Sequence, residues 1–408
     1  MKICVVTSYS VAVEPRAPRH ALAARRAFPE ADITLVDLAP EGHPRPPDPE
    51  SLREAGIERR TIEYPTRRAG AARLLGRRLR RHLSLASFST LGALSEGVFA
   101  ERVLGLTATL KRLGADAYVA HNIDALLPAF GAAQGRAAVL FDCMEYYSDM
   151  GDSQSPTEAR ATLVAERRFL PRCSLVLASS DSLADVLARQ YGIRRPMASY
   201  NVPPLAAALP SRRGDGLNLY WRNSVLGFGQ RGLDDALLAL QRLPPNVRLF
   251  LQGRPDHDGG AMIRSRAAEL EIGDRLTLLP PYSTQDAVEK AAHHDVGLCL
   301  ERQGPRNHEL TVSNKMFDYH MAGLAVVSSD MPSLSHVINR SGGGLLYKAG
   351  DPASLAAAIE KLHASPQLLR QLQERARCFA LKEANLEVEL DRLADAMRAC
   401  LGMGRHAG

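Results

Sequence analysis

Short apolar runs alternate with amphipathic segments at the start of the chain. Residues 2–7 (KICVVT) and 33–38 predict two buried strands, and the pattern of residues 18–28 between them predicts a helix. Strand, helix and strand in this order are typical of a parallel sheet that is covered by helices. The chain therefore begins as an α/β protein.

The alternation continues in two series, which a proline-rich, polar segment at residues 201–215 separates. In the first series, further strands are predicted at 117–120, 138–141, 174–178 and 197–200, and helices at 157–169 and 182–190. In the second, strands are predicted at 217–221, 247–252, 276–279, 296–300, 324–327 and 344–347, and helices at 233–242, 261–270, 284–293, 314–322, 334–338 and 352–363. This pattern predicts two doubly wound α/β domains.

The length of 408 residues also favours two domains, because single cores seldom grow to this size. We expect residues 1–205 and 206–382 to form two Rossmann-like domains that face each other across a cleft. Residues 383–408 are strongly helical, with apolar residues at helical spacing from Leu386 to Met397. We expect this last helix to pack back on the N-terminal domain.

The composition, with 45% hydrophobic and 24% charged residues, is that of a globular protein, and no run of 18 apolar residues could span a bilayer. The apolar run at the N-terminus is too short for a secretory signal. Six scattered cysteines form no C-x-x-C pair, so the sequence predicts neither a metal site nor a disulfide framework. We expect a cytoplasmic protein, with peripheral contact at the inner face of the membrane left open.

Seven arginines crowd into residues 67–81, and no acidic residue occurs between Glu63 and Glu96. The leucines of this segment share roughly one helical face, so it predicts a basic amphipathic helix that binds an anionic membrane or an acidic acceptor. The alternative is a solvated helix with its leucines in the core. Nucleic acid is less favoured, because no aromatic residue lies within the arginine run. The leucines are Leu74, Leu75, Leu79 and Leu83, and the arginines expected to face acceptor or membrane are Arg73, Arg77, Arg78 and Arg81.

Polar side chains follow two predicted strands of the first domain. His121 comes directly after the strand at 117–120, and Asp142 and Glu145 follow the strand at 138–141 in the sequence DCMEYY. In open α/β sheets the ligand crevice lies beyond the carboxyl ends of the strands, so these three residues are candidates for a catalytic role. Each of them would serve equally well as a helix cap or as a hydrogen-bond partner in a loop.

A second candidate site lies in the second domain, within residues 309–347. Ser313 is a good N-cap, Asn314 begins a short helix, and Gly323 ends it before a buried strand. Lys315 therefore falls in the first helical turn, where unpaired amides already favour an anion such as a nucleotide diphosphate. A solvated surface lysine is the alternative interpretation.

Four segments together resemble the GT-B glycosyltransferases, in particular family 4, the glycosyl transferases group 1. They are SNKMFDYHMAGLAVVSSDMP, in which Asp318 stands five positions before Gly323, GGGLLYKAGDPASLAAAI at residues 342–359, QRGLDDALLAL at residues 230–240, and VLFDCMEYY. The resemblance is strong over residues 215–360 and loose over the first 200. It implies the GT-B fold, with two Rossmann-like domains across a cleft.

The resemblance also implies an activity, which is transfer of a sugar from a nucleotide diphosphate sugar, most commonly a UDP-sugar, to an acceptor hydroxyl. It implies a retaining reaction without metal or cofactor, in which Arg231 and Lys315 stabilise the diphosphate and Asp318 contacts a hydroxyl of the ribose or sugar. The acceptor is a glycan, a lipid-linked molecule or a small molecule. The expected donor-binding residues are Arg231, Gly253, Tyr282, Glu309, Ser313, Asn314, Lys315 and Asp318.

One departure from the family pattern keeps other functions open. The family commonly has two glutamates separated by seven residues, whereas Asp318 replaces the second here, Leu310 occupies the position of the first, and Glu309 is one residue out of register. Inversion remains open, with Asp142 or Glu145 as the general base. A nucleotide-sugar epimerase and a non-catalytic GT-B binding subunit are the alternative functions.

Overall fold

The computed structural model describes residues 1–44, 47–151, 154–207, 216–229, 231–258 and 260–402. Contacts divide the chain into an N-terminal unit, Met1–Ser199 with the chain from Leu390 onward, and a C-terminal unit, Tyr200–Glu389. Part of the proline-rich segment expected at the domain boundary, residues 208–215, lies outside the described residues, as do Gln230 and the last residues of the chain.

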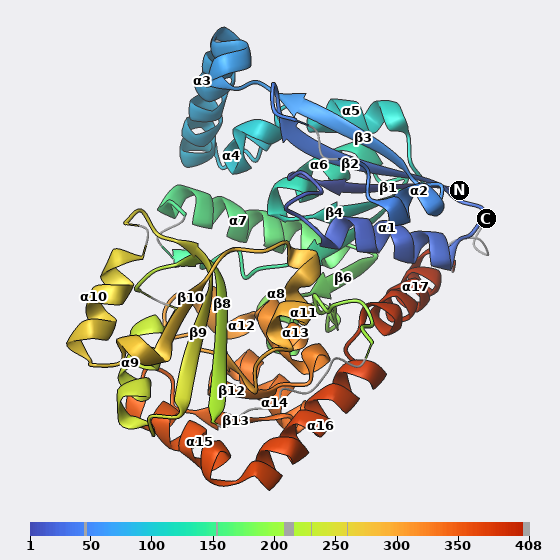
Figure 1. Cartoon of the computed structure of the whole chain (residues 1–408). Coiled ribbons are helices and arrows are strands. Elements are labelled where there is room, and N and C mark those ends of the chain that lie inside the picture. Colours follow the sequence, from blue (N-terminus) through green and yellow to red (C-terminus); the bar gives the residue numbers. More distant parts are fainter. Residues whose placement is uncertain (45–46, 152–153, 208–215, 230, 259, 403–408) are drawn as a thin grey trace. The chain divides into compact units, whose positions relative to one another are not determined.

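The N-terminal unit is a parallel sheet with the strand order β3-β2-β1-β4-β5-β6-β7. In Figure 1, α1 lies against β1 and β2, and α6 lies against β4 and β5. The strands are β1 (Lys2–Thr7), β2 (Asp32–Pro40), β3 (Glu58–Tyr64), β4 (Ala117–His121), β5 (Ala138–Cys143), β6 (Leu175–Ala178) and β7 (Met197–Ala198). The α-helices are α1 (Arg16–Ala27), α2 (Glu50–Glu54), α3 (Arg67–Leu91), α4 (Glu96–Phe99), α5 (Leu106–Leu113), α6 (Ile123–Ala133), α7 (Pro156–Phe169) and α8 (Asp181–Tyr191).

The C-terminal unit is a second parallel sheet, with the order β10-β9-β8-β11-β12-β13. Its strands are β8 (Leu217–Leu226), β9 (Val247–Pro255), β10 (Leu276–Leu279), β11 (Val296–Cys299), β12 (Ala325–Ser329) and β13 (Gly344–Tyr347). The helices are α9 (Leu233–Arg242), α10 (Ala261–Glu269), α11 (Ala287–Ala291), α12 (Arg306–Leu310), α13 (Asn314–Ala322), α14 (Pro332–Ser341), α15 (Pro352–Ala364), α16 (Pro366–Lys382) and α17 (Leu386–Gly402), of which α17 continues into the N-terminal unit. The prediction of two doubly wound α/β domains is confirmed.

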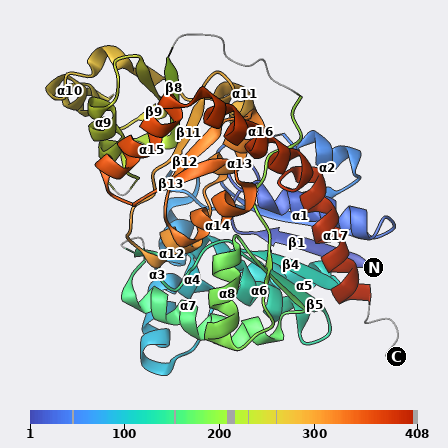
Figure 2. The ribbon, with the colours of Figure 1, turned by 90° about the horizontal axis from the view of Figure 1, so that it is seen from below.

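Two apolar cores cover the two faces of the C-terminal sheet. Helices α9, α10 and α15 bury their leucines and isoleucines against one face, and α13, α14 and α16 bury apolar and aromatic side chains against the other (Figure 2). A strand that is covered on both sides is mostly apolar, and β12 (AVVSS) accordingly contains no charged residue. At the end of α13, Gly323 adopts a left-handed conformation with φ +78°, as expected for a residue that ends a helix.

A buried histidine makes the C-terminal unit sensitive to acid. His320 on α13 is fully buried, and burial lowers its pKa to about 3. Below pH 6.5 this histidine is protonated in the unfolded chain but stays neutral in the folded chain. The free energy of unfolding therefore decreases as the pH is lowered. Between pH 7 and pH 5 we expect this histidine to reduce the free energy of unfolding by about 2 kcal/mol. Urea unfolding of the wild type and of His320→Gln at both pH values measures the effect, and an equal pH dependence of the two proteins would contradict it.

Candidate functional site

The candidate donor site lies at the switch point of the C-terminal sheet. The chain runs outward from β8 through β9 to β10 on one side, and from β11 through β12 to β13 on the other. Ligands of open α/β sheets bind beyond the carboxyl ends of the strands at such a point. Arg231 lies in the connection after β8, and Glu301 comes two residues after the end of β11. The topology therefore places a cation and a carboxylate together beyond the carboxyl ends of the two central strands, β8 and β11.

A glycine sets the distance between these two residues. Gly232 has φ +68° and directly precedes α9, and a Cβ added to it would lie 2.1 Å from the carbonyl oxygen of Leu300. Only glycine combines this backbone conformation with so close an approach. The result is that Nη1 of Arg231 lies 3.8 Å from Oε1 of Glu301, beside the N-terminus of α9, while 45% of the arginine side chain stays exposed. Arg231 is free to reach an anion.

Lys315 is buried in an ion pair instead of lying on the surface. Its Nζ is 2.9 Å from Oε1 of Glu301, the lysine and glutamate side chains are 5% and 7% exposed, and the ammonium group lies 5.5 Å from the centroid of the Trp221 ring. Burial alone would raise the pKa of Glu301, but the charges of Lys315 and Arg231 outweigh it and lower the pKa. Two cations thus share one carboxylate, which leaves a net charge of +1.

Glu301 was absent from the residues predicted from the sequence. A usable signal was nevertheless present, because Glu301 is a carboxylate at the end of the predicted strand 296–300, as Asp142 is for the strand 138–141. The sequence pattern placed Lys315 in the first helical turn, which the structure bears out with α13 beginning at Asn314. It gave no indication that a partner 14 residues earlier would bury the lysine.

Asp318 and Tyr282 both lie beside an arginine that the sequence had not singled out. The Asp318 carboxylate pairs with the guanidinium of Arg222, which lies in the middle of β8. Burial would lower the pKa of Arg222, but the charge of Asp318 and the neighbouring tyrosines raise it above its usual value. Tyr282 is half-buried, and its hydroxyl interacts with the same guanidinium. An oxygen of Asp318 is therefore held by an internal cation.

The remaining expected donor residues are placed as follows. Ser313 occupies the N-cap position of α13, but its side chain makes no capping hydrogen bond, and Asn314 is exposed. Glu309 is half-buried on α12, while Leu310, at the position of the first family glutamate, is buried. Gly253 lies on β9, where a Cβ would meet the carbonyl oxygen of Asn223 at 2.0 Å. The close approach of the Asn223 carbonyl therefore requires a glycine at position 253, independently of any contact with a ligand.

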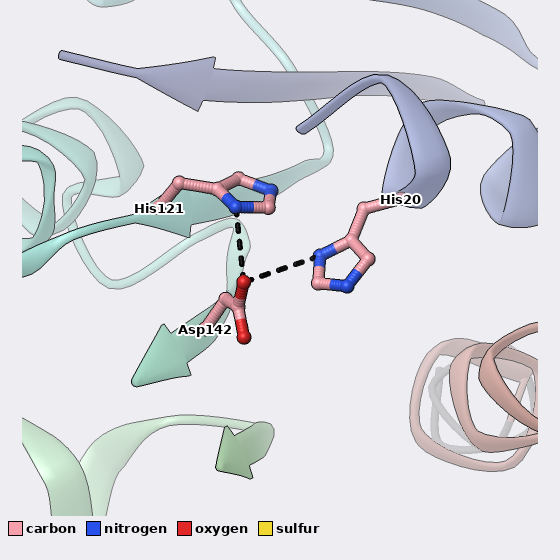
Figure 3. A group of neighbouring side chains, drawn as sticks. All are labelled: His20, His121 and Asp142. Carbon is pink, nitrogen blue, oxygen red and sulfur yellow. Dashed lines mark ion pairs between the residues drawn. The ribbon is translucent and has the colours of Figure 1, made fainter. Parts of the chain in front are cut away.

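In the N-terminal unit, His121 and Asp142 face each other across neighbouring strands. They are register partners at the ends of β4 and β5, and His121 Nδ1 lies 3.1 Å from Oδ2 of Asp142 (Figure 3). Two residues of α1 complete the cluster, since Arg16 donates to both oxygens of Asp142 at 2.6 and 2.8 Å, and His20 Nδ1 lies 4.0 Å from Oδ2. Glu145 is half-buried in the loop after β5.

The protonation states in this cluster follow from burial and the arginine. Burial would raise the pKa of Asp142, but the charge of Arg16 and its hydrogen bonds hold it well below its usual value. Burial lowers the pKa of His20 well below 6.5, and the nearby Asp142 does not reverse the shift. The cluster therefore contains an ionised Asp142–Arg16 pair beside a neutral His20.

The same cluster has the spacing of metal ligands but not the charge of a metal site. His20, His121 and Asp142 offer ligand atoms that lie within 4.8 Å of one another, and all three are buried. A metal-binding carboxylate needs a free oxygen, whereas both oxygens of Asp142 accept hydrogen bonds from Arg16. A divalent cation bound to His20, His121 and Asp142 would also lie next to the positive charge of Arg16, and the three ligands include only one anion. The donor set therefore does not fit a metal ion.

Comparison with known proteins agrees with this organisation. Residues 228–379, which include Arg231, Glu301, Lys315 and Asp318, match the family model of the glycosyl transferases group 1. No curated protein sequence matches the chain significantly.

Solved structures match over nearly the whole chain. HepE from Anabaena in complex with UDP and glucose has a TM-score of 0.69 at 15% identity, and covers 98% of this chain and 100% of its own. Sucrose-phosphate synthase from Thermosynechococcus elongatus has a TM-score of 0.69 at 16% identity, covering 99% and 100%. A glycosyltransferase from Rickettsia africae has a TM-score of 0.70 at 12% identity, covering 98% of each chain. The likeness shows the fold, which is GT-B, as the sequence predicted.

Proposed function

We propose that this chain, with the GT-B fold and a match to the glycosyl transferases group 1 over residues 228–379, is a glycosyltransferase. It moves a sugar from a nucleotide diphosphate sugar to an acceptor hydroxyl. The observation that carries the proposal is the arrangement of Arg231, Glu301 and Lys315 at the switch point of the C-terminal sheet, beside the N-terminus of α9.

Glycosyl transfer from a nucleotide diphosphate sugar requires positive charge near the leaving diphosphate. Transfer breaks the bond between the anomeric carbon of the sugar and the diphosphate oxygen, and the carbon forms a new bond to the acceptor oxygen, whose proton is released. Negative charge grows on the departing diphosphate, and fixed cations and helix amides stabilise it. Arg231 supplies an exposed cation, Lys315 a buried one, and α9 its first amides. The proposed reaction relies on these groups, needs no cofactor and is formulated without a metal ion.

The donor that we propose to test first is UDP-glucose. HepE, which shares the fold, was solved with UDP, with UDP and glucose, and with UDP-glucose. Asp318 and Tyr282, which meet at Arg222, are the groups that we assign to the hydroxyls and the base of the nucleotide. A carboxylate accepts hydrogen bonds from a diol, which is why we assign Asp318 to the hydroxyls.

We assign the acceptor to the N-terminal unit and favour retention of configuration. Asp142 is fully buried with both oxygens bonded to Arg16, so it is better suited to positioning His121 than to acting as a general base. Inversion would instead require Glu145 as the base. A glycan, a lipid-linked molecule and a small molecule remain the candidate acceptors, and we propose that the enzyme acts in the cytoplasm.

A thermal-shift panel of nucleotide sugars tests the donor, because a ligand at 100 times its Kd stabilises the folded protein by roughly 2.7 kcal/mol. Product analysis after incubation with the stabilising donor separates the functions. A sugar transferred to an added acceptor supports the proposal. An epimerised donor with no transfer would identify an epimerase, and donor binding with no turnover would identify a binding subunit.

Arg231→Ala provides the cleanest test of the donor site. The side chain is exposed and lies 3.8 Å from the carboxylate of Glu301, so we expect a change in stability below about 0.5 kcal/mol. The turnover number should fall by on the order of 100-fold or more, because one charge opposite the leaving diphosphate is lost. Arg248→Ala, at an exposed position of β9, is the matched control and should keep full activity. Equal activity of both variants would remove Arg231 from the mechanism.

A further inference from the structure

Helix α3 presents a ridge of leucines to solvent. Leu75, Leu79 and Leu83 are 70%, 60% and 61% exposed, and their spacing of four residues puts them on one face of the helix. Leu74 and Phe88 are buried and face the unit instead. The interpretation that the leucines of this segment lie in the core is therefore wrong for three of the four.

Exposed arginines flank this leucine ridge on both sides. At 3.6 residues per turn, Arg78 and Arg80 lie about 100° to either side of Leu79. Both are exposed, with 45% of the Arg78 side chain accessible to solvent. Arg78 has only a distant carboxylate neighbour, since its Nε lies 3.9 Å from Oε2 of Glu101. The outer face of α3 is thus apolar along its middle and basic along its edges.

Two further arginines fix the orientation of the helix. Arg77 donates hydrogen bonds to the backbone carbonyls of Glu101, Arg102 and Leu104, and Arg81 pairs with Glu158 on α7. Arg77 therefore turns toward the protein, which corrects the expectation that it faces acceptor or membrane, whereas Arg81 is tied to Glu158 and still borders the surface cavity described next. They fasten α3 in the orientation that leaves the leucine ridge outside.

A basic cavity adjoins the edge of the ridge. Its volume is about 490 Å³, and three arginines line it. Arg81 pairs with Glu158 and Arg102 with Asp124, whereas Arg78 has its nearest carboxylate, that of Glu101, at 3.9 Å. The lining residues are Arg78, Arg81, His82, Phe99, Ala100, Glu101 and Arg102. Guanidinium groups bind phosphate oxygens through paired hydrogen bonds, so the cavity suits a phosphate group that lies beside apolar chains.

We propose that the leucine ridge and the adjoining cavity of α3 bind the surface of an anionic phospholipid bilayer. The leucines enter the boundary between headgroups and acyl chains, the flanking arginines contact lipid phosphates, and the cavity takes one headgroup. The contact that we propose is peripheral, and no helix among the described residues is long and apolar enough to cross a membrane. A nucleic acid would match the arginines but would leave the leucines in water, and an acidic protein would have to supply an apolar groove as well.

Binding of the full-length chain to vesicles tests this proposal without any sugar donor, so its failure is separate from that of the proposed function. Vesicles of equal parts phosphatidylglycerol and phosphatidylcholine should sediment the wild type, and vesicles of phosphatidylcholine alone should not. Leu75→Gln/Leu79→Gln/Leu83→Gln should weaken binding roughly tenfold or more, because the apolar insertion is lost. Arg78→Gln/Arg80→Gln should weaken it roughly 25-fold, at about fivefold for each charge.

The matched control replaces exposed apolar residues of the C-terminal unit, Leu205→Gln/Met262→Gln/Leu381→Gln, and should bind as the wild type does. All variants change exposed positions, and circular dichroism with a Tm measurement checks that each is folded. Vesicle binding that survives the leucine substitutions would overturn the proposal. Binding of the wild type to polyglutamate but to neither kind of vesicle would also overturn it, and would identify an acidic protein partner.

Discussion

Lys315→Ala is expected to lower the free energy of unfolding of the C-terminal unit by about 3–5 kcal/mol, because it leaves the buried Glu301 without its close partner. Arg231, at 3.8 Å and with nearly half of its side chain exposed, replaces only part of that charge. Donor turnover should be lost at the same time. Urea unfolding at pH 7.5 measures the first effect, and assays with the stabilising nucleotide sugar measure the second.

The pH dependence of this loss identifies its cause. In the wild type the pKa of Glu301 is lowered, so the ion pair contributes stability above the ordinary carboxyl pKa and loses it as the pH falls through the lowered value. Without Lys315, burial dominates and raises the pKa of Glu301, so acid relieves the penalty by protonating the carboxylate. The difference between Lys315→Ala and the wild type should therefore be smaller at pH 5 than at pH 8. A constant difference would point to lost packing against Trp221 instead.

A double variant separates stability from catalysis. Glu301→Gln/Lys315→Met removes both buried charges at similar volume, and such replacements usually change stability by no more than about 1–2 kcal/mol. We expect this protein to be folded near neutral pH and still unable to turn over the donor. If it were stable and fully active, the assignment of Lys315 to the diphosphate would have to be abandoned.

The strands that the sequence predicted correctly have apolar cores, whether they lie inside a sheet or at its edge, as β10 and β13 do. Residues 2–7 and 138–141 appear as β1 and β5, because interior strands of a parallel sheet are apolar over most of their length. Strand β3, with the sequence ERRTIEY, was missed. It has a neighbour on one side only, at the edge of the sheet, where charged side chains are tolerated and obscure the strand pattern.

The sequence could predict those site residues that stand at the carboxyl ends of strands. His121 and Asp142 were found because parallel strands place their carboxyl ends together, and the structure pairs them in register. Arg16 and His20 were missed, because helical spacing in α1 does not show which polar residue meets the sheet. For α3, the helical repeat of 3.6 residues shows that Leu75, Leu79 and Leu83 share a face, but only the structure shows that this face is exposed to solvent.

The N-terminal cluster should be as sensitive to charge removal as the donor site. Asp142→Asn is expected to lower the free energy of unfolding of the N-terminal unit by about 3–5 kcal/mol, because a neutral amide does not compensate the buried Arg16 guanidinium. The pKa of Asp142 is held well below its usual value, so the wild-type pair is intact above pH 4 and is lost only as the pH falls through that lowered pKa. Unfolding by urea at pH 7 tests this, and a loss below about 1 kcal/mol would contradict it.

Arg16→Met/Asp142→Asn decides whether the cluster acts in the reaction or only holds the unit together. Removal of both charges should restore stability to within about 1–2 kcal/mol of the wild type. Transfer to the acceptor should remain impaired, because His121 Nδ1 no longer faces a carboxylate at 3.1 Å that fixes its ring and tautomer. The pH profile of the turnover number should shift as well, which a purely structural role would not cause. A stable double variant with the wild-type rate and pH profile would assign Asp142 to folding alone.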